Sequence, residues 1–154
     1  MSPERRLQEL GIELPPAPKP VASYVPAVQV GNLLFMSGNG PLRAGKPLVQ
    51  GRLGETMTVE QGADAARQTM LNLLSTVRDT LGSLDRVERI VKLLGFVNSA
   101  PDFTQQPAVV NGASELLLQI FGERGRHARS AIGTSVLPFG IPVEIEMIVQ
   151  VRPG

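Results

Sequence analysis

The chain contains no cysteine and no tryptophan, only one tyrosine (Tyr24) and only one histidine (His127). The absence of cysteine excludes disulfides, thiolate metal ligands and a cysteine nucleophile. A single histidine without cysteine cannot make a typical structural zinc site, so we expect no metal. With five phenylalanines as the other aromatic residues, the core must be mainly aliphatic.

A strong net charge is also absent, because the 15 basic and 14 acidic residues give a net charge of only +1. A nucleic-acid ligand usually requires a concentrated basic face, so we expect no nucleic-acid partner. The basic cluster of residues 124–129 is the only candidate patch, and we interpret it as a solvated loop with one functional arginine.

Long apolar runs are missing too. The N-terminus, MSPERRLQEL, has no apolar signal core, and no stretch reaches the ~18 apolar residues of a membrane span. We therefore expect a soluble, unexported, cytoplasmic protein with no membrane partner.

The N-terminal pattern predicts a short helix followed by an extended lead. Ser2 caps residues 3–10 with proline at the first helical position, and Gly11 ends the helix. Prolines 15, 16, 18, 20 and 26 then exclude both a helix and a central strand. We interpret residues 1–154 as one domain and residues 1–20 as its N-terminal extension.

The middle of the chain alternates strand and helix signals. Gly31-Asn32 between two apolar runs predicts a hairpin. Thr58 and Gln61 form a capping box at the start of a helix over 58–81, and a second helix is expected over 102–121. Between these helices, residues 89–98 form a β-branched run typical of a buried strand, and residues 42–55 are predicted to be irregular, with a short strand near 47–50.

The C-terminal segment alternates with period two. Every odd position from 141 to 151 is apolar, so one face is buried and Glu144 and Glu146 share the other. We expect residues 129–137 to be the partner strand, joined through 138–140. Together these elements predict a two-layer α+β domain with two long helices on one face of a four- to six-stranded sheet. The other face is apolar enough to indicate oligomerisation.

Arg129 is the leading candidate for a ligand-binding residue. The residues after it have small side chains, which leaves space for a ligand. A guanidinium can also bind a carboxylate through two parallel hydrogen bonds. An intrachain ion pair with a glutamate is the alternative. Glu144 is the natural acid or base near it, but in the expected hairpin the two lie on the order of 20 Å apart at ~3.3 Å per residue. Either they belong to different sites or they meet across subunits.

The other polar candidates have weaker patterns. No GxSxG elbow accompanies His127, so a Ser-His-acid triad is poorly supported and we expect His127 and Glu146 to be structural. Ser37-Gly38 could let the backbone approach a ligand or could be a plain turn. Tyr24 could close a pocket or simply pack against the sheet edge.

Three motifs resemble the reactive intermediate deaminase family (RidA/YjgF, also labelled endoribonuclease L-PSP or translation inhibitor). They are YVPAVQVGNLLFMSGNGP, IVKLLGFVNSAPDF and ARSAIGTSVLPFGIPVEIEMIVQV, within a resemblance that runs from Val21 to Arg152. The resemblance implies a chorismate-mutase-like α+β fold with a six-stranded mixed sheet. It also implies a homotrimeric barrel with sites at the subunit interfaces.

The resemblance further implies an activity. This is the hydrolysis of reactive 2-enamine and 2-imine carboxylates, such as 2-aminoacrylate and 2-iminopropanoate, to 2-keto acids and ammonia, without a cofactor. Arg129 matches the residue that clamps the substrate carboxylate and Glu144 the acid that directs water. The matched binding residues are Tyr24, Ser37, Gly38 and Ala131, where Ala131 stands at a position that is often cysteine in the family. The N-terminal extension and the GERGRHAR connection depart from the pattern.

Other functions use the same inventory. A non-catalytic protein could sense a keto or amino acid with the same clamp, and the fold could persist as an inactive scaffold. Ribonuclease or translation-inhibiting activity has poor support, because there is no aromatic stacking platform and no basic stripe. Ammonia release separates the deaminase from the binding protein.

Overall fold

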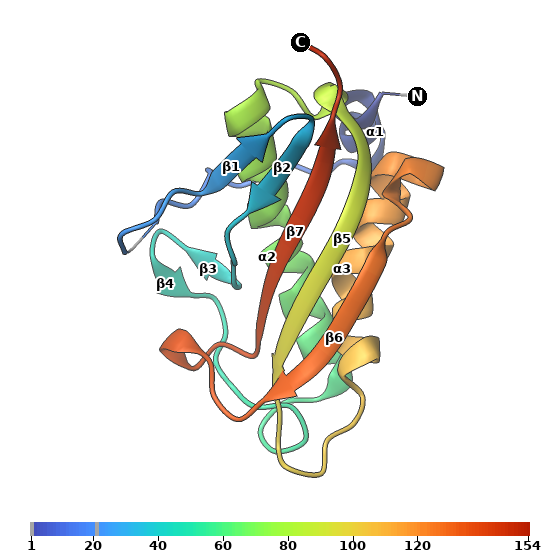
Figure 1. The fold of residues 1–154 in the computed structure, drawn as a ribbon. Helices are drawn as coiled ribbons and strands as arrows, with labels where there is room; N and C mark the ends of the chain where they lie inside the picture. Colours follow the sequence, from blue (N-terminus) through green and yellow to red (C-terminus); the bar gives the residue numbers. More distant parts are fainter. Residues whose placement is uncertain (1, 21) are drawn as a thin grey trace.

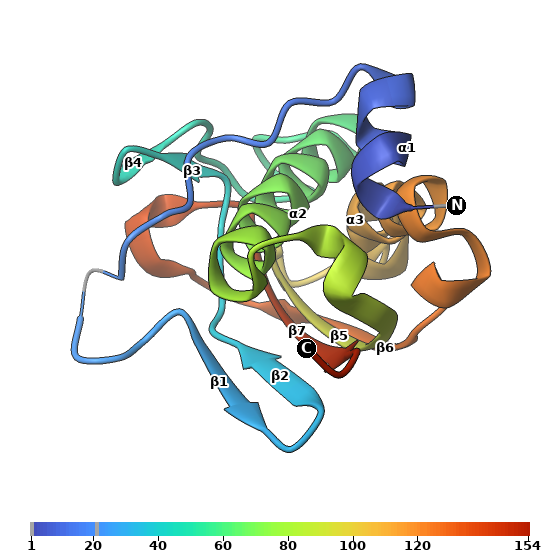
Figure 2. The ribbon, with the colours of Figure 1, turned by 90° about the horizontal axis from the view of Figure 1, so that it is seen from above.

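The computed structural model describes residues 2–20 and 22–154, so Val21, where the resemblance begins, lies outside the described residues. The described chain forms an α+β fold in which the helices lie on one side of a mixed sheet (Figures 1 and 2). The elements are α1 (Pro3–Leu10), β1 (Ala27–Val30), β2 (Leu33–Met36), β3 (Leu42–Arg43), β4 (Lys46–Pro47), α2 (Val59–Leu81), β5 (Val87–Asn98), α3 (Gln106–Phe121), β6 (Ala128–Thr134) and β7 (Val143–Val151).

Helix α2 forms where its capping signals predict. The Thr58 hydroxyl accepts from the Gln61 backbone, and the Gln61 side chain accepts from the Thr58 backbone, at 3.2 and 2.9 Å. The helix ends at Gly82, whose φ of 88° suits glycine. Helix α3 begins at Gln106, later than the predicted start at 102. The reason is Pro107, which fits the first turn of a helix but not a position farther inside.

Among the described residues, the main sheet has five strands in the order β1-β2-β7-β5-β6, so the six-stranded prediction is wrong. After β2 the chain pairs with β7 once more, through an isolated bridge between Asn39 and Ile145, and β3 and β4 then pair with each other as a separate ribbon. Strand β7 buries its odd-numbered side chains against the helices, as predicted, and none of them is more than 3% exposed. Glu144 and Glu146 share the opposite, helix-free face.

The predicted hairpin between residues 129–137 and 141–151 is wrong. Strand β6 runs parallel to β5, and β7 pairs antiparallel with β5 on its other side. The connection from β6 to β7 therefore passes the end of β5. Asn98 holds it there: its backbone N–H donates to Pro142 O at 2.8 Å and its side-chain amide donates to Ile141 O at 3.2 Å.

The N-terminal extension is part of the packed structure. Leu7 of α1 is 2% exposed and belongs to the main core. Glu4 receives two hydrogen bonds from the Arg78 guanidinium, at 2.9 and 2.8 Å, which join α1 to α2. Farther along, Ser75 donates to Pro15 O at 2.6 Å. The lead thus follows α2 toward the β3–β4 ribbon (Figure 2). No described helix is long and apolar enough to cross a membrane.

Candidate functional site

Arg129 lies near the start of β6, on the face of the sheet that the helices cover. It is in register with Leu93, a fully buried core residue of β5. Its Nη1 donates to Asn111 Oδ1 at 2.8 Å and to Ser114 Oγ at 3.1 Å, and its Nη2 donates to Pro107 O at 3.4 Å. All three acceptors are neutral groups of α3.

No aspartate or glutamate among the described residues forms an ion pair with Arg129, so the alternative of an intrachain glutamate partner is not realised. Neutral acceptors orient a guanidinium without cancelling its charge. The arginine is therefore fixed in direction and still able to attract an anion.

His127 supports this arrangement through Ser114. Its Nδ1 lies 2.6 Å from Gly125 O, and since a carbonyl can only accept, Nδ1 holds the proton. Burial lowers the pKa of His127, and the Arg129 charge lowers it further, against an opposing effect of the Gly125 bond. The neutral ring thus accepts from the Ser114 hydroxyl at 2.9 Å through Nε2, which leaves the Ser114 oxygen free to accept from Arg129.

Ser114 and His127 are as close as a catalytic nucleophile and its general base, but the groups around them differ from those of a catalytic triad. The third group is the Gly125 carbonyl instead of a carboxylate, and Ser114 already binds Arg129. The pair positions the arginine. These hydrogen bonds are consistent with the structural role expected for His127, which stays a prediction, whereas roles for Asn111 and Ser114 were not predicted. Their signal was available: two polar residues three apart on one helix lie on the same side of it.

Glu144 lies on β7 and faces the other side of the sheet. A Cβ at Gly38 would lie 2.8 Å from Glu144 Oε2, so a larger residue at this position would displace the carboxylate from the place that it occupies here. Asn39 keeps this segment beside β7 by exchanging two backbone hydrogen bonds with Ile145, each of 2.9 Å. Burial raises the pKa of Glu144, and the nearby Glu146 charge raises it further.

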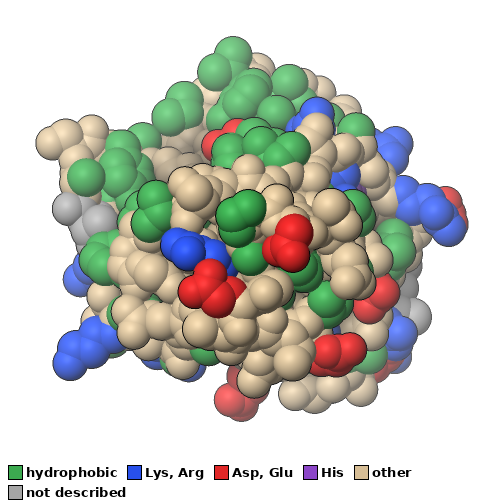
Figure 3. All heavy atoms as spheres, turned by 90° about the horizontal axis from the view of Figure 1, so that it is seen from below, with side chains coloured by type: hydrophobic (Ala, Val, Ile, Leu, Met, Phe, Trp, Pro, Cys, Tyr) green, Lys and Arg blue, Asp and Glu red, His purple; other side chains and the backbone are tan. Residues whose placement is uncertain are grey.

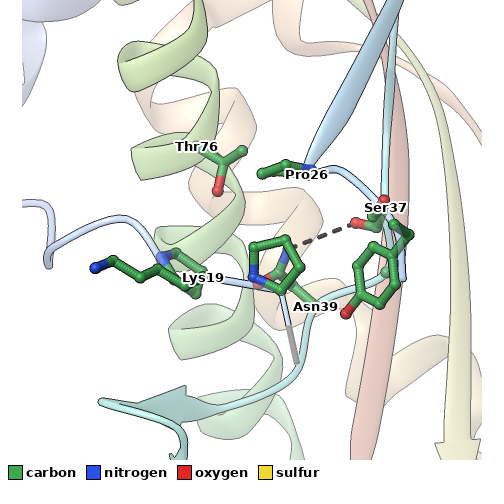
Figure 4. A pocket seen from close by; sticks show the side chains of 9 residues that line it. Lys19, Pro26, Ser37, Asn39 and Thr76 are labelled. Atoms are coloured by element: carbon green, nitrogen blue, oxygen red, sulfur yellow. Dashed lines mark hydrogen bonds between the residues drawn. The ribbon is translucent and has the colours of Figure 1, made fainter. Parts of the chain in front are cut away.

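Tyr24, Ser37 and Gly38 line one small hollow between the lead and the end of β2, together with Thr76 of α2 (Figure 4). Ser37 fixes the neighbouring segment, because its hydroxyl donates to Val25 O at 2.6 Å and its N–H donates to Pro26 O at 2.9 Å. Gly38 both lines this hollow and contacts Glu144. That these residues line a substrate pocket stays a prediction.

The six predicted residues nevertheless form two groups within one chain. Tyr24, Ser37, Gly38 and Glu144 form one, and Arg129 with Ala131 on β6 forms the other. Glu144 is in register with Phe96 and through it with Ile132, so two strand spacings and three residues separate it from Arg129, about 14 Å between Cα atoms. The two side chains also point to opposite faces. One small ligand cannot contact both within one chain.

No cluster of three or more His, Asp or Glu side chains in the described part of the chain could hold a metal ion. The basic cluster of residues 124–129 does not act as one patch either. Arg126 pairs with Glu123 at 3.2 Å, Arg124 donates to Val87 O, and Arg129 faces α3. On the underside of the molecule, acidic and basic side chains are interspersed (Figure 3).

The family model described as "YjgF/chorismate_mutase-like, putative endoribonuclease" matches residues 4–148. The chain belongs to the RidA/YjgF family. Protein TCP17 of Trypanosoma cruzi is 48% identical over 95% of this chain and 92% of its own length. The 2-iminobutanoate/2-iminopropanoate deaminase of Dermatophagoides farinae is 32% identical over 99% and 100%. The structure of Atu1372, a protein of unknown function from Agrobacterium tumefaciens, superposes with a TM-score of 0.89 at 44% identity, covering 97% and 92%.

These RidA/YjgF relatives extend over nearly the whole chain, including the N-terminal extension that departs from the three quoted motifs. One of them has a deaminase name, and the others have names that state no reaction. These matches show membership in the RidA/YjgF family but not the reaction.

Proposed function

We propose that this protein hydrolyses 2-enamine and 2-imine carboxylates to 2-keto acids and ammonia. The observation that supports this most is Arg129: a guanidinium oriented by three neutral acceptors, with no acidic partner among the described residues. Such a group suits a substrate carboxylate, to which it presents parallel N–H donors. The relative from Dermatophagoides farinae, whose name states this activity, adds support.

In this proposal, Glu144 supplies the proton transfers. An imine carbon is already electrophilic, so the protein needs only orientation and a positioned water. The enamine first takes a proton at C3 from water and becomes the imine, which reacts in its N-protonated form. As water adds to C2, the Glu144 carboxylate takes one proton from that water and a neutral carbinolamine forms. Glu144 then gives this proton to the nitrogen, the C2–N bond breaks and ammonia leaves, and the hydroxyl proton passes to the Glu144 carboxylate as the C2 carbonyl of the keto acid forms. A raised pKa suits a group that must both accept and return a proton. No cofactor takes part.

We also propose that the site is completed by a second copy of the chain, in a homotrimeric barrel. Arg129 and Glu144 point to opposite faces, so one active site requires Arg129 from one protomer and Glu144 from another. The helix-free face has apolar side chains that a partner would cover, among them Val28, Phe35 and Ile132, which are 52%, 41% and 47% exposed. Strand β6 lies at the edge of the sheet, so Arg129 is close to the place where a second protomer would contact this edge.

The test is a coupled assay in which a pyridoxal-phosphate serine or threonine dehydratase generates the imine and keto-acid formation is followed. The wild-type protein should accelerate keto-acid and ammonia release, and Arg129→Ala should not. If a folded, oligomeric wild-type protein binds a keto acid but gives no acceleration, the protein is a binding protein and the deaminase proposal is wrong.

A further inference from the structure

A second and larger cavity lies between the proline-rich lead and the β3–β4 ribbon. Its volume is about 420 Å³, within the range of small-molecule sites. Residues 16–20 form one wall, residues 42–45 form another, and Asn72 of α2 reaches it from the helix. Most of the lining is apolar, because it consists mainly of prolines, alanines and Leu42. Neither Arg129 nor Glu144 lines it.

Two cations stand at this cavity. Lys19 and Arg43 are among the residues that line it, and neither side chain forms a hydrogen bond or ion pair with any residue in the described part of the chain. In Figure 4 the Lys19 ammonium points away from Ser37 and Asn39, so its charge is not directed into the hollow that Tyr24 lines. Two unpaired positive charges beside an apolar cavity are complementary to an anion with an apolar body.

Asn72 adds a polar group at the same cavity, although the residue is only 2% exposed. Its Nδ2 donates to Gly40 O at 3.0 Å and to Leu42 O at 2.8 Å, which uses both donors and fixes the orientation of the amide. Its Oδ1 accepts no hydrogen bond from the described residues. A buried amide with a spare acceptor is typical of the few polar groups that orient a ligand in an apolar site.

We infer that this cavity is a binding site for a small amphipathic carboxylate. The apolar body packs against the prolines of the lead and against Leu42, and the carboxylate lies toward Lys19 and Arg43. Because Pro18, Lys19 and Pro20 line both this cavity and the Tyr24 hollow, a bound ligand holds the wall that the two share. The site is separate from the proposed deaminase chemistry, and binding can be measured without any turnover.

Octanoate is the probe, with octanol as its uncharged counterpart, titrated into isotopically labelled full-length protein at about 0.15 M salt, where distant charges are screened. Amide shifts should saturate for residues 42–45 and 72. The double variant Lys19→Gln/Arg43→Gln should weaken octanoate binding roughly fivefold, with octanol binding unchanged. Lys46→Gln is the matched control, because it removes a charge from the same ribbon without lining the cavity.

Equal affinities of octanoate and octanol, or of the wild type and the double variant, would overturn the proposal. So would shifts confined to the helix-free face around Ile132 and Ile148, or no saturating shift at all. Both substituted side chains are exposed, and an unchanged spectrum away from the cavity verifies that the variant is folded.

Discussion

At the scale of single residues, the most informative feature is the arginine oriented by uncharged neighbours. A guanidinium next to a carboxylate of its own chain would be neutralised before any substrate arrived. Here Asn111 and Ser114 orient it, and neutral His127 orients Ser114 in turn. The directions of the hydrogen bonds that link His127, Ser114 and Arg129 follow from one fact: the Gly125 carbonyl can only accept, so it must accept from His127 Nδ1.

Ser114→Ala should therefore weaken substrate binding without removing the clamp. The arginine loses one of its three acceptors, so we expect KM to rise about fivefold with kcat little changed. Steady-state kinetics in the coupled assay measure both. Gln119→Ala, an exposed position on the same helix, is the control. An unchanged KM in Ser114→Ala would show that the serine does not position Arg129.

The raised pKa of Glu144 gives a second residue-scale prediction. If the ionised carboxylate takes the proton from water, kcat/KM should fall as pH drops through a value above the ordinary glutamate pKa, because a raised pKa means that ionisation requires a higher pH. Glu146→Gln removes a like charge, so the acidic limb should move to lower pH. Glu144→Gln should abolish activity. An acidic limb that stays in place or moves upward in Glu146→Gln would contradict this account.

At the scale of elements, α1 behaves as part of the core rather than as an appended segment. Leu7→Ala should lower the free energy of unfolding by about 2–3 kcal/mol, since a fully buried leucine is replaced and a cavity remains. Denaturant unfolding measures this. Arg5→Ala, on the exposed side of α1, should change stability by less than about 0.5 kcal/mol. Equal effects of both would mean that α1 does not pack in solution.

Local signals were sufficient for most elements. The capping box of Thr58 and Gln61, the Gly31-Asn32 turn and the alternation over 141–151 each depend on residues close in sequence, and the structure confirms all three. The predicted helix start at residue 102 was wrong, because Pro107 fits only the first turn of a helix and so excludes a helical turn before it.

The pairing of β6 with β5 could not be predicted from such local signals. Ser130 and Ala131 have small side chains and Gly133 has none, so β6 has no strongly apolar face and its partner strand depends on distant contacts. The short link to β7 suggests a hairpin. Arg52 and Asn98 instead hold that link across the end of β5, with Arg52 donating to Asn98 Oδ1 at 3.0 Å and to Ser135 O at 2.7 Å. Identifying the site residues depended on the family resemblance. The sequence predicted that Arg129 and Glu144 are separated within one chain, but from a hairpin that does not form. The fold gives the actual reason, which is that they lie on strands two apart and point to opposite faces of the sheet.

At the scale of the whole molecule, the helix-free face should be an interface between copies. Ile132→Lys places a charge on that face and should dissociate the proposed trimer, because burying an unpaired ammonium is strongly unfavourable. Light scattering after size-exclusion chromatography gives the mass. Leu118→Lys is the control: it changes an apolar residue of α3 with similar exposure, 38% against 47%. A wild-type protein that is monomeric, or an Ile132→Lys variant that keeps its mass, would contradict this assembly.

The central claim is that Arg129 of one protomer and Glu144 of another form one site, and subunit mixing tests it most directly. Arg129→Ala and Glu144→Gln should each be inactive alone. After the two variants are unfolded together and refolded in equal amounts, about a quarter of the wild-type activity should return, because a random cyclic assembly brings an intact Arg129 and an intact Glu144 together at about one interface in four. If the mixture forms hybrid oligomers and stays inactive, both residues must act within one chain, and the account is wrong.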